Sequence, residues 1–250
     1  MNTIEFIADD LGMDERTNLA IERCHREGVL TGASLMLGQP GTAHGIEVAR
    51  RNPELSVGWH FHACDSQPLT RTHWPWGRSP AMAGLAIAFL PSARTLIRQE
   101  IRIQWQQMEA SGLRCEFINS HHHIHIHPFL AREMRAVVPK SFNGWIRSFN
   151  VEPFKPGSLG ARRCLRRPAR QWLRCWEGVR HSDSLWGVDR IFSMDESEIM
   201  CAIGQFSDGL HEFHFHPRGG PDDADMRALL ALRNHPGFAR NRRLTTCSLA

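Results

Sequence analysis

The chain has 250 residues, of which 42% are hydrophobic, and a formal net charge of only +4. A chain of this length fits one large α/β domain, whose core needs no disulfide bond or structural metal ion. Its 7 cysteines are odd in number and never form a Cys-x-x-Cys pair, which argues against a disulfide framework or a zinc ribbon and indicates a reducing compartment.

Strand-like stretches alternate with helical patterns along the chain. The stretches that indicate short buried strands are residues 3–8, 33–37, 55–61, 115–119, 145–149, 190–192 and 210–215. The expected helices are one that Asp14 caps and Gly28 ends, and four more at about 92–111, 129–138, 196–206 and 223–233. This alternation predicts a parallel sheet covered by helices.

The number and spacing of these strands favour a barrel over an open nucleotide-binding sheet. About seven strands over this length suit a closed or nearly closed (β/α) barrel, and no Gly-x-Gly-x-x-Gly motif follows the first strand. Residues 65–79 and 151–160 are rich in Pro, Gly and polar residues, so we expect them to form long loops at the mouth of the barrel. We expect a single domain over residues 1–250.

Two adjacent aspartates, Asp9 and Asp10, follow the first predicted strand. Barrel enzymes place their chemistry where strands end. Neighbouring carboxylates are costly there unless a cation or a proton separates their roles. The alternative is a helix N-cap, where aspartate is also favoured.

Histidines follow the third predicted strand and recur further along the chain. His60 and His62 are two residues apart, so on a strand both imidazoles would point to the same face. The tract 121–127 alternates His121, His123, His125 and His127 with His122, Ile124 and Ile126. In an extended segment this places four imidazoles on one face and predicts a metal-binding tract, with a surface histidine cluster as the alternative.

The last predicted strand carries a further cluster. His214 and His216 alternate with Phe213 and Phe215, as in a strand that is polar on one side and buried on the other. Glu212 and His216 are four residues apart at the end of this strand, which suits a general acid and a carboxylate that orients it.

Two imidazoles and one carboxylate leave positions open on a divalent ion, as a catalytic metal site requires. Such an ion activates water, and hydrolysis also needs a base and an acid. The ligand types leave other functions open. These are a metal-dependent phosphoesterase or amidohydrolase, to which the His60-x-His62 pair points, an iron oxygenase, and a non-enzymatic histidine-rich metal-binding protein.

In their order along the chain, these clusters resemble the YdjC-like carbohydrate deacetylase family. The motifs are ADDLGM (8–13), VGWHF (57–61), NSHHHIHIHP (119–128) and EFHFHP (212–217), and GVLTGASLML (28–37) looks like the family's second strand. Within the family, residues 28–53 and 88–104 look most like the branch associated with hopanoid lipid biosynthesis.

The resemblance implies a distorted TIM-like barrel that removes the N-acetyl group from an N-acetylglucosamine-type sugar. It implies a divalent metal ion, Zn²⁺ or Mg²⁺, on Asp10, His60 and His121. By similarity Asp9 is the general base and His216 the general acid, while His123 and His125 contact substrate or orient the metal ligands. The family commonly continues the last motif with Gly or Ala, where this chain has Arg218, and this departure bears on the identity of the substrate.

Three features bear on the substrate and its location. Trp74 and Trp76 are candidates to stack on the sugar ring, and the apolar run 81–90 either lines the mouth or packs as a core helix. This run is about half as long as a membrane-spanning helix, and no signal peptide is evident. The arginines at 162, 163, 166, 167, 170, 174 and 180 form either a solvated helix face or a patch for anionic lipid or phosphate. We therefore expect a cytoplasmic enzyme, peripheral at the inner membrane face, with a lipid-linked substrate and no nucleic-acid partner.

Overall fold

A parallel sheet of nine strands forms the centre of the protein in a computed structural model, which describes residues 2–236 and 238. The strands are β1 (Asn2–Leu11), β2 (Gly32–Leu35), β3 (Ser56–Phe61), β4 (Phe117–Ser120), β5 (Trp145–Ile146), β6 (Val151–Glu152), β7 (Arg180–His181), β8 (Ser184–Trp186) and β9 (Gly209–Phe215). Their order is β6-β8-β9-β1-β2-β3-β4-β5-β7, and every neighbouring pair is parallel. The predicted parallel sheet is confirmed.

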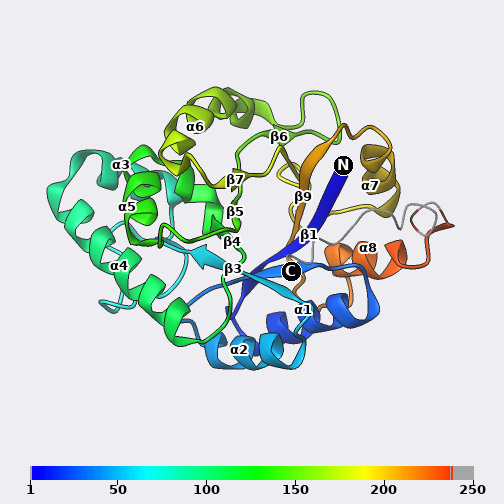
Figure 1. The fold of residues 1–250 in the computed structure, drawn as a ribbon, viewed down its shortest axis with the longest axis horizontal. Coiled ribbons are helices and arrows are strands. Elements are labelled where there is room, and N and C mark those ends of the chain that lie inside the picture. The colour runs from blue at the N-terminus through cyan, green and yellow to red at the C-terminus, as the bar shows by residue number, and fades with distance from the viewer. Residues whose placement is uncertain (1, 237, 239–250) are drawn as a thin grey trace.

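The predicted count of about seven strands is wrong. Two extended segments are each interrupted, so that each contributes two short strands instead of one. β5 and β6 are parts of residues 145–152, and β7 and β8 are parts of residues 180–186. β5 pairs with β7 and β6 pairs with β8, so the two segments run side by side. They carry both edge strands of the sheet, which curls (Figure 1).

Helices surround the curled sheet, as the prediction requires (Figure 1). They are α1 (Glu15–Glu27), α2 (Thr42–Arg51), α3 (Pro80–Phe89), α4 (Pro91–Ala110), α5 (Pro128–Val137), α6 (Arg166–Trp172), α7 (Glu196–Ile203) and α8 (Ala224–Leu232). Three 3₁₀ helices, η1 (His121–Ile126), η2 (Gly160–Leu165) and η3 (Leu173–Trp176), lie between them in the chain.

Helix α1 begins and ends where the sequence predicts. The Asp14 carboxylate accepts a hydrogen bond from the Thr17 N–H at 2.7 Å, which satisfies one of the free donors of the first turn. The N–H of Gly28 donates to the Cys24 carbonyl at 3.0 Å and ends the helix. The other four predicted helices correspond to α4, α5, α7 and α8.

Other predicted boundaries are wrong. Residues 190–192 form a turn rather than a strand. The strand nearest to them in the chain is β8, whose Leu185 is buried. The predicted loop 151–160 begins with β6. Helix α2 was not predicted. Helices α3 and α6 were each named only as one of two alternatives, a core helix for residues 81–90 and a solvated helix face for the arginines. For α3 the sequence pattern could not decide, because the helix is apolar on all sides and shows no helical period.

Aromatic packing fixes the strands whose carboxyl ends carry the polar clusters. Phe6 of β1 stacks on Phe213 of β9 with ring centroids 5.4 Å apart. Trp59 of β3 packs edge-on against Trp105 of α4 at 5.2 Å. Such pairs add to the stabilisation from buried apolar area, so the ends of β1, β3 and β9 are held on a rigid support.

Helix α3, the apolar run of the sequence, packs only one side against the protein. Ala83 and Ile87 are buried, whereas Met82 and Leu85 are each 54% exposed and Phe89 is 77% exposed. In the described part of the chain no single helix is long and apolar enough to span a membrane. The pair α3–α4 reaches that length and composition together, but bends by 113°.

Candidate metal centre

A β-bulge sets the directions of the two aspartates at the end of β1. The pairing of β1 with β2 shifts register between Ala8 and Leu11, so Asp9 and Asp10 lie in the irregular stretch. Asp10 has a φ of 68°, in the left-handed region that aspartate tolerates better than most residues. Bulges next to active sites re-aim side chains, and here the two carboxylates have different surroundings.

Asp10 lies against two imidazoles from neighbouring strand ends. Its Oδ1 is 3.2 Å from His60 Nε2 and 2.9 Å from His121 Nδ1. All three residues are buried and can each offer a ligand atom within 4.8 Å of the others. The predicted metal ligands Asp10, His60 and His121 are therefore brought together.

The polar atoms of this cluster fit a divalent cation. His60 Nδ1 donates to Asn119 Oδ1 at 2.6 Å, which fixes the tautomer and leaves a lone pair on Nε2. Within the described part of the chain, His60 Nε2 and His121 Nε2 are buried without a hydrogen-bond partner. Buried polar atoms are rarely left unpaired, and two imidazole nitrogens beside a carboxylate are ligands that zinc and similar ions prefer.

The charge state of Asp10 also suits a cation. Burial alone would raise the pKa of Asp10, but the imidazoles of His121 and His60 hold it well below its usual range. The second oxygen, Oδ2, accepts a hydrogen bond from Arg218 Nη2 at 2.6 Å. Arg218, which departs from the family pattern, thus fixes the orientation of a candidate ligand.

The histidine tract is not extended, and the predicted alternation of faces is wrong. After β4 the chain turns into η1, where His122 and His123 have left-handed φ values of 54°. His123 lines the same cavity as Asp10 and His121, and its Nδ1 is buried with no hydrogen-bond partner among the described residues. His125 is fully buried and contacts the Ser120 hydroxyl and the Arg147 carbonyl, so its contacts are structural.

Asp9 is held by an arginine that the sequence analysis did not identify. Arg147 Nη1 and Nη2 donate to the two Asp9 carboxylate oxygens at 2.6 and 2.8 Å, and Arg147 Nε donates to Glu212 at 2.6 Å. All three residues are buried. Burial would raise the pKa of Asp9, but Arg147 and His60 hold it well below its usual range. Burial raises the pKa of Glu212 to about 7 despite Arg147.

His216 lies near Asp9 rather than near Glu212's carboxylate. Asp9, His214 and His216 form a second group whose potential ligand atoms lie within 4.8 Å of one another. Burial lowers the pKa of His216 to about 4, so its imidazole is neutral. Because Glu212 bonds to Arg147, it does not orient His216 as the sequence spacing suggested. The Asp225 carboxylate instead accepts the His216 backbone N–H at 2.7 Å.

These groups open into one cavity of about 540 Å³. Asp9, Asp10, His60, His121 and His216 line it, together with Asp65 and Arg78 of the predicted mouth loop.

The remaining predicted site residues lie outside this cavity. The His62 imidazole contacts the Leu37 carbonyl and the Ser66 hydroxyl. Trp74 is buried and stacks on Trp76 at 5.6 Å. The stacking of sugar on Trp74 and Trp76 stays a prediction, and in this structure neither indole lines the cavity.

Comparison with known proteins identifies related sequences and a shared fold. Residues 4–243 match the family described as YdjC-like protein. A carbohydrate deacetylase of Brevibacillus brevis is 35% identical over 125 residues, which are 48% of this chain and 49% of the relative. One of Vibrio vulnificus is 33% identical over 132 residues, 49% and 50% of the two chains. The chain thus spans about half the length of the curated relatives it matches.

A solved structure shares the fold over nearly the whole chain. It is the crystal structure of a proposed cellobiose-phosphate cleavage protein from Enterococcus faecalis, with a TM-score of 0.67 and 16% identity. The match covers 98% of this chain and 96% of that one.

Proposed function

The chain belongs to the YdjC-like protein family, and from this membership we propose that it is a metal-dependent carbohydrate deacetylase that hydrolyses the N-acetyl group of an amino sugar. The observation that carries the proposal is the buried cluster of Asp10, His60 and His121, with two unpaired imidazole nitrogens, beside Asp9 and His216 in one cavity. The curated relatives named carbohydrate deacetylases support it.

The side chains divide the reaction between them. When bound, a divalent ion polarises the acetyl carbonyl and makes a water molecule more acidic. Asp9, kept ionised by Arg147, accepts a proton from the attacking water. His216 is neutral at rest and near Asp9, so it can receive that proton and donate it to the leaving nitrogen. The products are acetate and a free amine.

The structure gives the rival functions less support. A phosphoesterase or amidohydrolase site would use His60 and His62 together, but the His62 imidazole is engaged by Leu37 and Ser66. A carrier that only binds metal has no use for the buried Asp9–Arg147 pair, whose desolvation is costly.

Incubation of the purified protein with N-acetylglucosaminyl substrates is expected to release acetate and amine in equal amounts. A chelator should stop the reaction, and an added divalent ion should restore it, because the ligand cluster cannot activate water alone. Metal analysis of the same preparation and p-nitrophenyl phosphate as a control substrate complete the test. Phosphate release without acetate release would contradict the proposal.

Exposed apolar side chains around the cavity support a lipid-linked sugar, such as a glucosaminyl hopanoid, as the substrate. Leu165, Ile191 and Phe192 line the cavity and are 40%, 40% and 55% exposed. Pro80, the first residue of α3, also lines it, and Leu85 and Phe89 of the same helix are exposed. Exposed apolar surface marks interaction sites, and a hydrocarbon aglycone matches these side chains.

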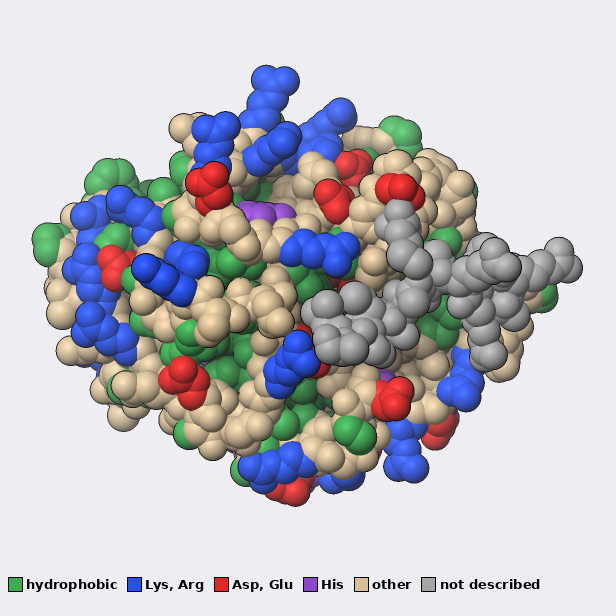
Figure 2. Space-filling model, viewed as in Figure 1, with side chains coloured by type: hydrophobic (Ala, Val, Ile, Leu, Met, Phe, Trp, Pro, Cys, Tyr) green, Lys and Arg blue, Asp and Glu red, His purple; other side chains and the backbone are tan. Residues whose placement is uncertain are grey.

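Charge on the same segments supports contact with an anionic membrane, and with it a cytoplasmic location at the inner membrane face. Residues 66–99, which include α3, carry four arginines and no acidic residue. Residues 153–176 carry six arginines, one lysine and no acidic residue. Figure 2 shows basic side chains gathered over α6. Each basic residue near an anionic surface contributes about 1 kcal/mol.

The protein is therefore expected to co-sediment with anionic vesicles at low salt and much less at high salt, since salt screens the arginines. Leu85→Ser/Phe89→Ser should weaken binding, because both side chains belong to the exposed face of α3. Leu19→Ser is the matched control, as Leu19 is 53% exposed on α1. Absence of vesicle binding, together with faster turnover of soluble N,N′-diacetylchitobiose than of lipid-linked sugar, would contradict the lipid substrate.

A further inference from the structure

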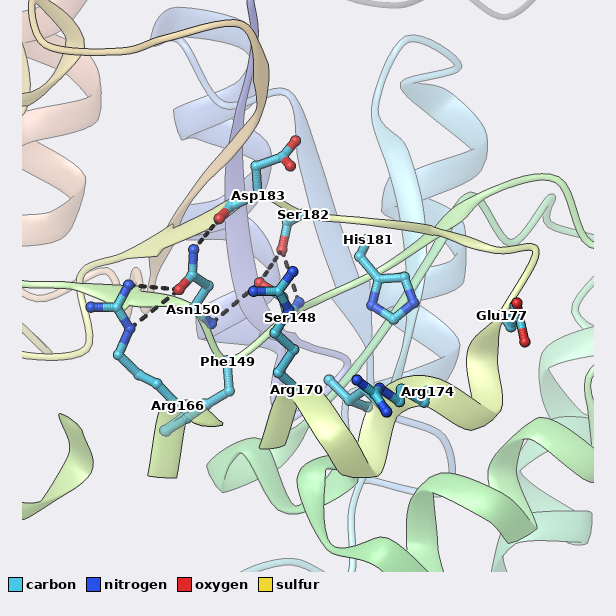
Figure 3. A pocket seen from close by; sticks show the side chains of 11 residues that line it. Ser148, Phe149, Asn150, Arg166, Arg170, Arg174, Glu177, His181, Ser182 and Asp183 are labelled. Carbon is cyan, nitrogen blue, oxygen red and sulfur yellow. Dashed lines mark hydrogen bonds between the residues drawn. The ribbon is translucent and has the colours of Figure 1, made fainter. Parts of the chain in front are cut away.

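A second, larger cavity of about 740 Å³ lies between α6–η3 and the interrupted strands β5–β6 and β7 (Figure 3). Its helical side is formed by Arg166, Arg170, Leu173 and Arg174, and its strand side by Ser148, Phe149, Asn150, His181, Ser182 and Asp183, with Glu177 at the margin. The proposed deacetylation uses none of these residues.

The side chains of two of the three arginines have no partner among the described residues. Arg166, Arg170 and Arg174 follow one another at intervals of four residues, so they share one face of the helical segment. Arg166 pairs with Glu152 at 2.6 Å and with Asn150. Neither the Arg170 nor the Arg174 side chain forms an ion pair or hydrogen bond within the residues that the structure describes. In Figure 3 both extend from the helix beside the strand residues of the cavity.

The two acidic residues of the cavity do not neutralise this pair. The Asp183 carboxylate accepts the Leu210 N–H at 2.7 Å, and it points away from the arginines (Figure 3). Glu177 lies on the Arg174 side of the cavity, away from Arg166 (Figure 3), but among the described residues its carboxylate forms no ion pair with Arg170 or Arg174. The arginine side of the cavity therefore keeps an excess of positive charge.

The opposite wall offers neutral hydrogen-bonding groups. Ser182 and Ser148 lie side by side, with their hydroxyl oxygens 3.3 Å apart. The His181 imidazole is half-buried next to them, and burial lowers its pKa. Phe149 lines both this cavity and that of the candidate metal centre, so the two cavities are neighbours.

We propose that this cavity is a binding site for a phosphate group, held by Arg170 and Arg174 with Arg166 beside them, and distinct from the metal centre. Guanidinium groups bind phosphate through paired charge-assisted hydrogen bonds, and two of them match a dianion. The hydroxyls of Ser148 and Ser182 and the imidazole of His181 add neutral polar groups on the strand side of the cavity. The phosphate comes either from a lipid headgroup or from a soluble phosphate. The inference does not depend on the deacetylase reaction.

Calorimetric titration of the full chain with inorganic phosphate, at constant ionic strength, tests the site without any turnover. Arg170→Gln/Arg174→Gln is expected to weaken phosphate binding by about tenfold or more, since each substitution removes charge-assisted hydrogen bonds. Arg163→Gln/Arg167→Gln is the matched control, because it removes the same charge from exposed arginines of the same segment that do not line the cavity. Circular dichroism should show the same fold for both variants.

Vesicles of phosphatidylcholine with and without phosphatidic acid distinguish the two sources. If the phosphate belongs to a lipid, binding that depends on phosphatidic acid should fall in Arg170→Gln/Arg174→Gln more than in the control. If only inorganic phosphate shows this difference, the source is soluble. Three results would overturn the site: equal losses in the two double variants, acetate binding as tight as phosphate, or no binding of either phosphate source by the unchanged protein.

Discussion

Replacing Asp10 or His121 with alanine is expected to abolish metal binding and hydrolysis together while the protein stays folded. Each residue supplies one of only three side-chain ligands in the cluster with His60, and the carboxylate is the only negative charge among them. A site with two ligands left binds a divalent ion weakly. Metal content by mass spectrometry, acetate release and circular dichroism on the same samples measure the three quantities.

The controls for this prediction lie next to the ligands in the chain. His127→Ala should keep both metal and activity, because His127 belongs to none of the candidate ligand groups found among the described residues and instead caps α5. Asp9→Asn and His216→Ala should keep the metal but lose activity, by about 10²- to 10⁴-fold for a missing base or acid. Equal loss of metal in Asp9→Asn and in the Asp10 variant would show that the roles of the two aspartates are assigned wrongly.

The sequence predicted the residues at strand ends well because their position follows from the strand itself. Asp10 and His60 come directly from β1 and β3, and His216 follows β9, so the parallel arrangement brings them to one edge of the sheet. Given the strand order, no further information is needed to group these residues. The bulge that separates Asp9 from Asp10 could not be predicted, since aspartate fits a regular strand end and a left-handed residue equally well in sequence.

Other parts of the site depend on contacts that leave no local pattern. The alternating histidine tract has the period of a strand, yet left-handed residues at His122 and His123 turn it into η1. Arg147 is one arginine in the predicted strand 145–149, and its partners Asp9 and Glu212 are 138 and 65 residues away in the chain. A buried ion network of this kind follows from tertiary structure alone.

Replacing Arg147 with methionine is expected to destabilise the fold by about 3–5 kcal/mol at neutral pH, the usual effect of leaving a buried charge without its partner. Two buried carboxylates, Asp9 and Glu212, would face each other with no cation between them. Urea denaturation of both proteins gives the difference. The control is Arg23→Met, which breaks the exposed pair with Glu27 and should cost less than about 1 kcal/mol.

The pH dependence of this loss identifies its cause. Burial would raise the pKa of Asp9, but Arg147 keeps it well below its usual range. Asp9 therefore stabilises the fold at pH values above its pKa in the unfolded chain, and this stabilisation is lost as the pH falls. The contribution of Glu212 to stability changes with pH in the opposite direction. Burial raises the pKa of Glu212 to about 7, so this contribution is lost as the pH rises from 4.5 to about 7. Without Arg147 both carboxyls resist ionisation. The difference in unfolding free energy between the variant and the unchanged protein should therefore grow from acid to neutral pH. A difference that is the same at every pH would mean that Arg147 stabilises the fold by packing rather than by charge.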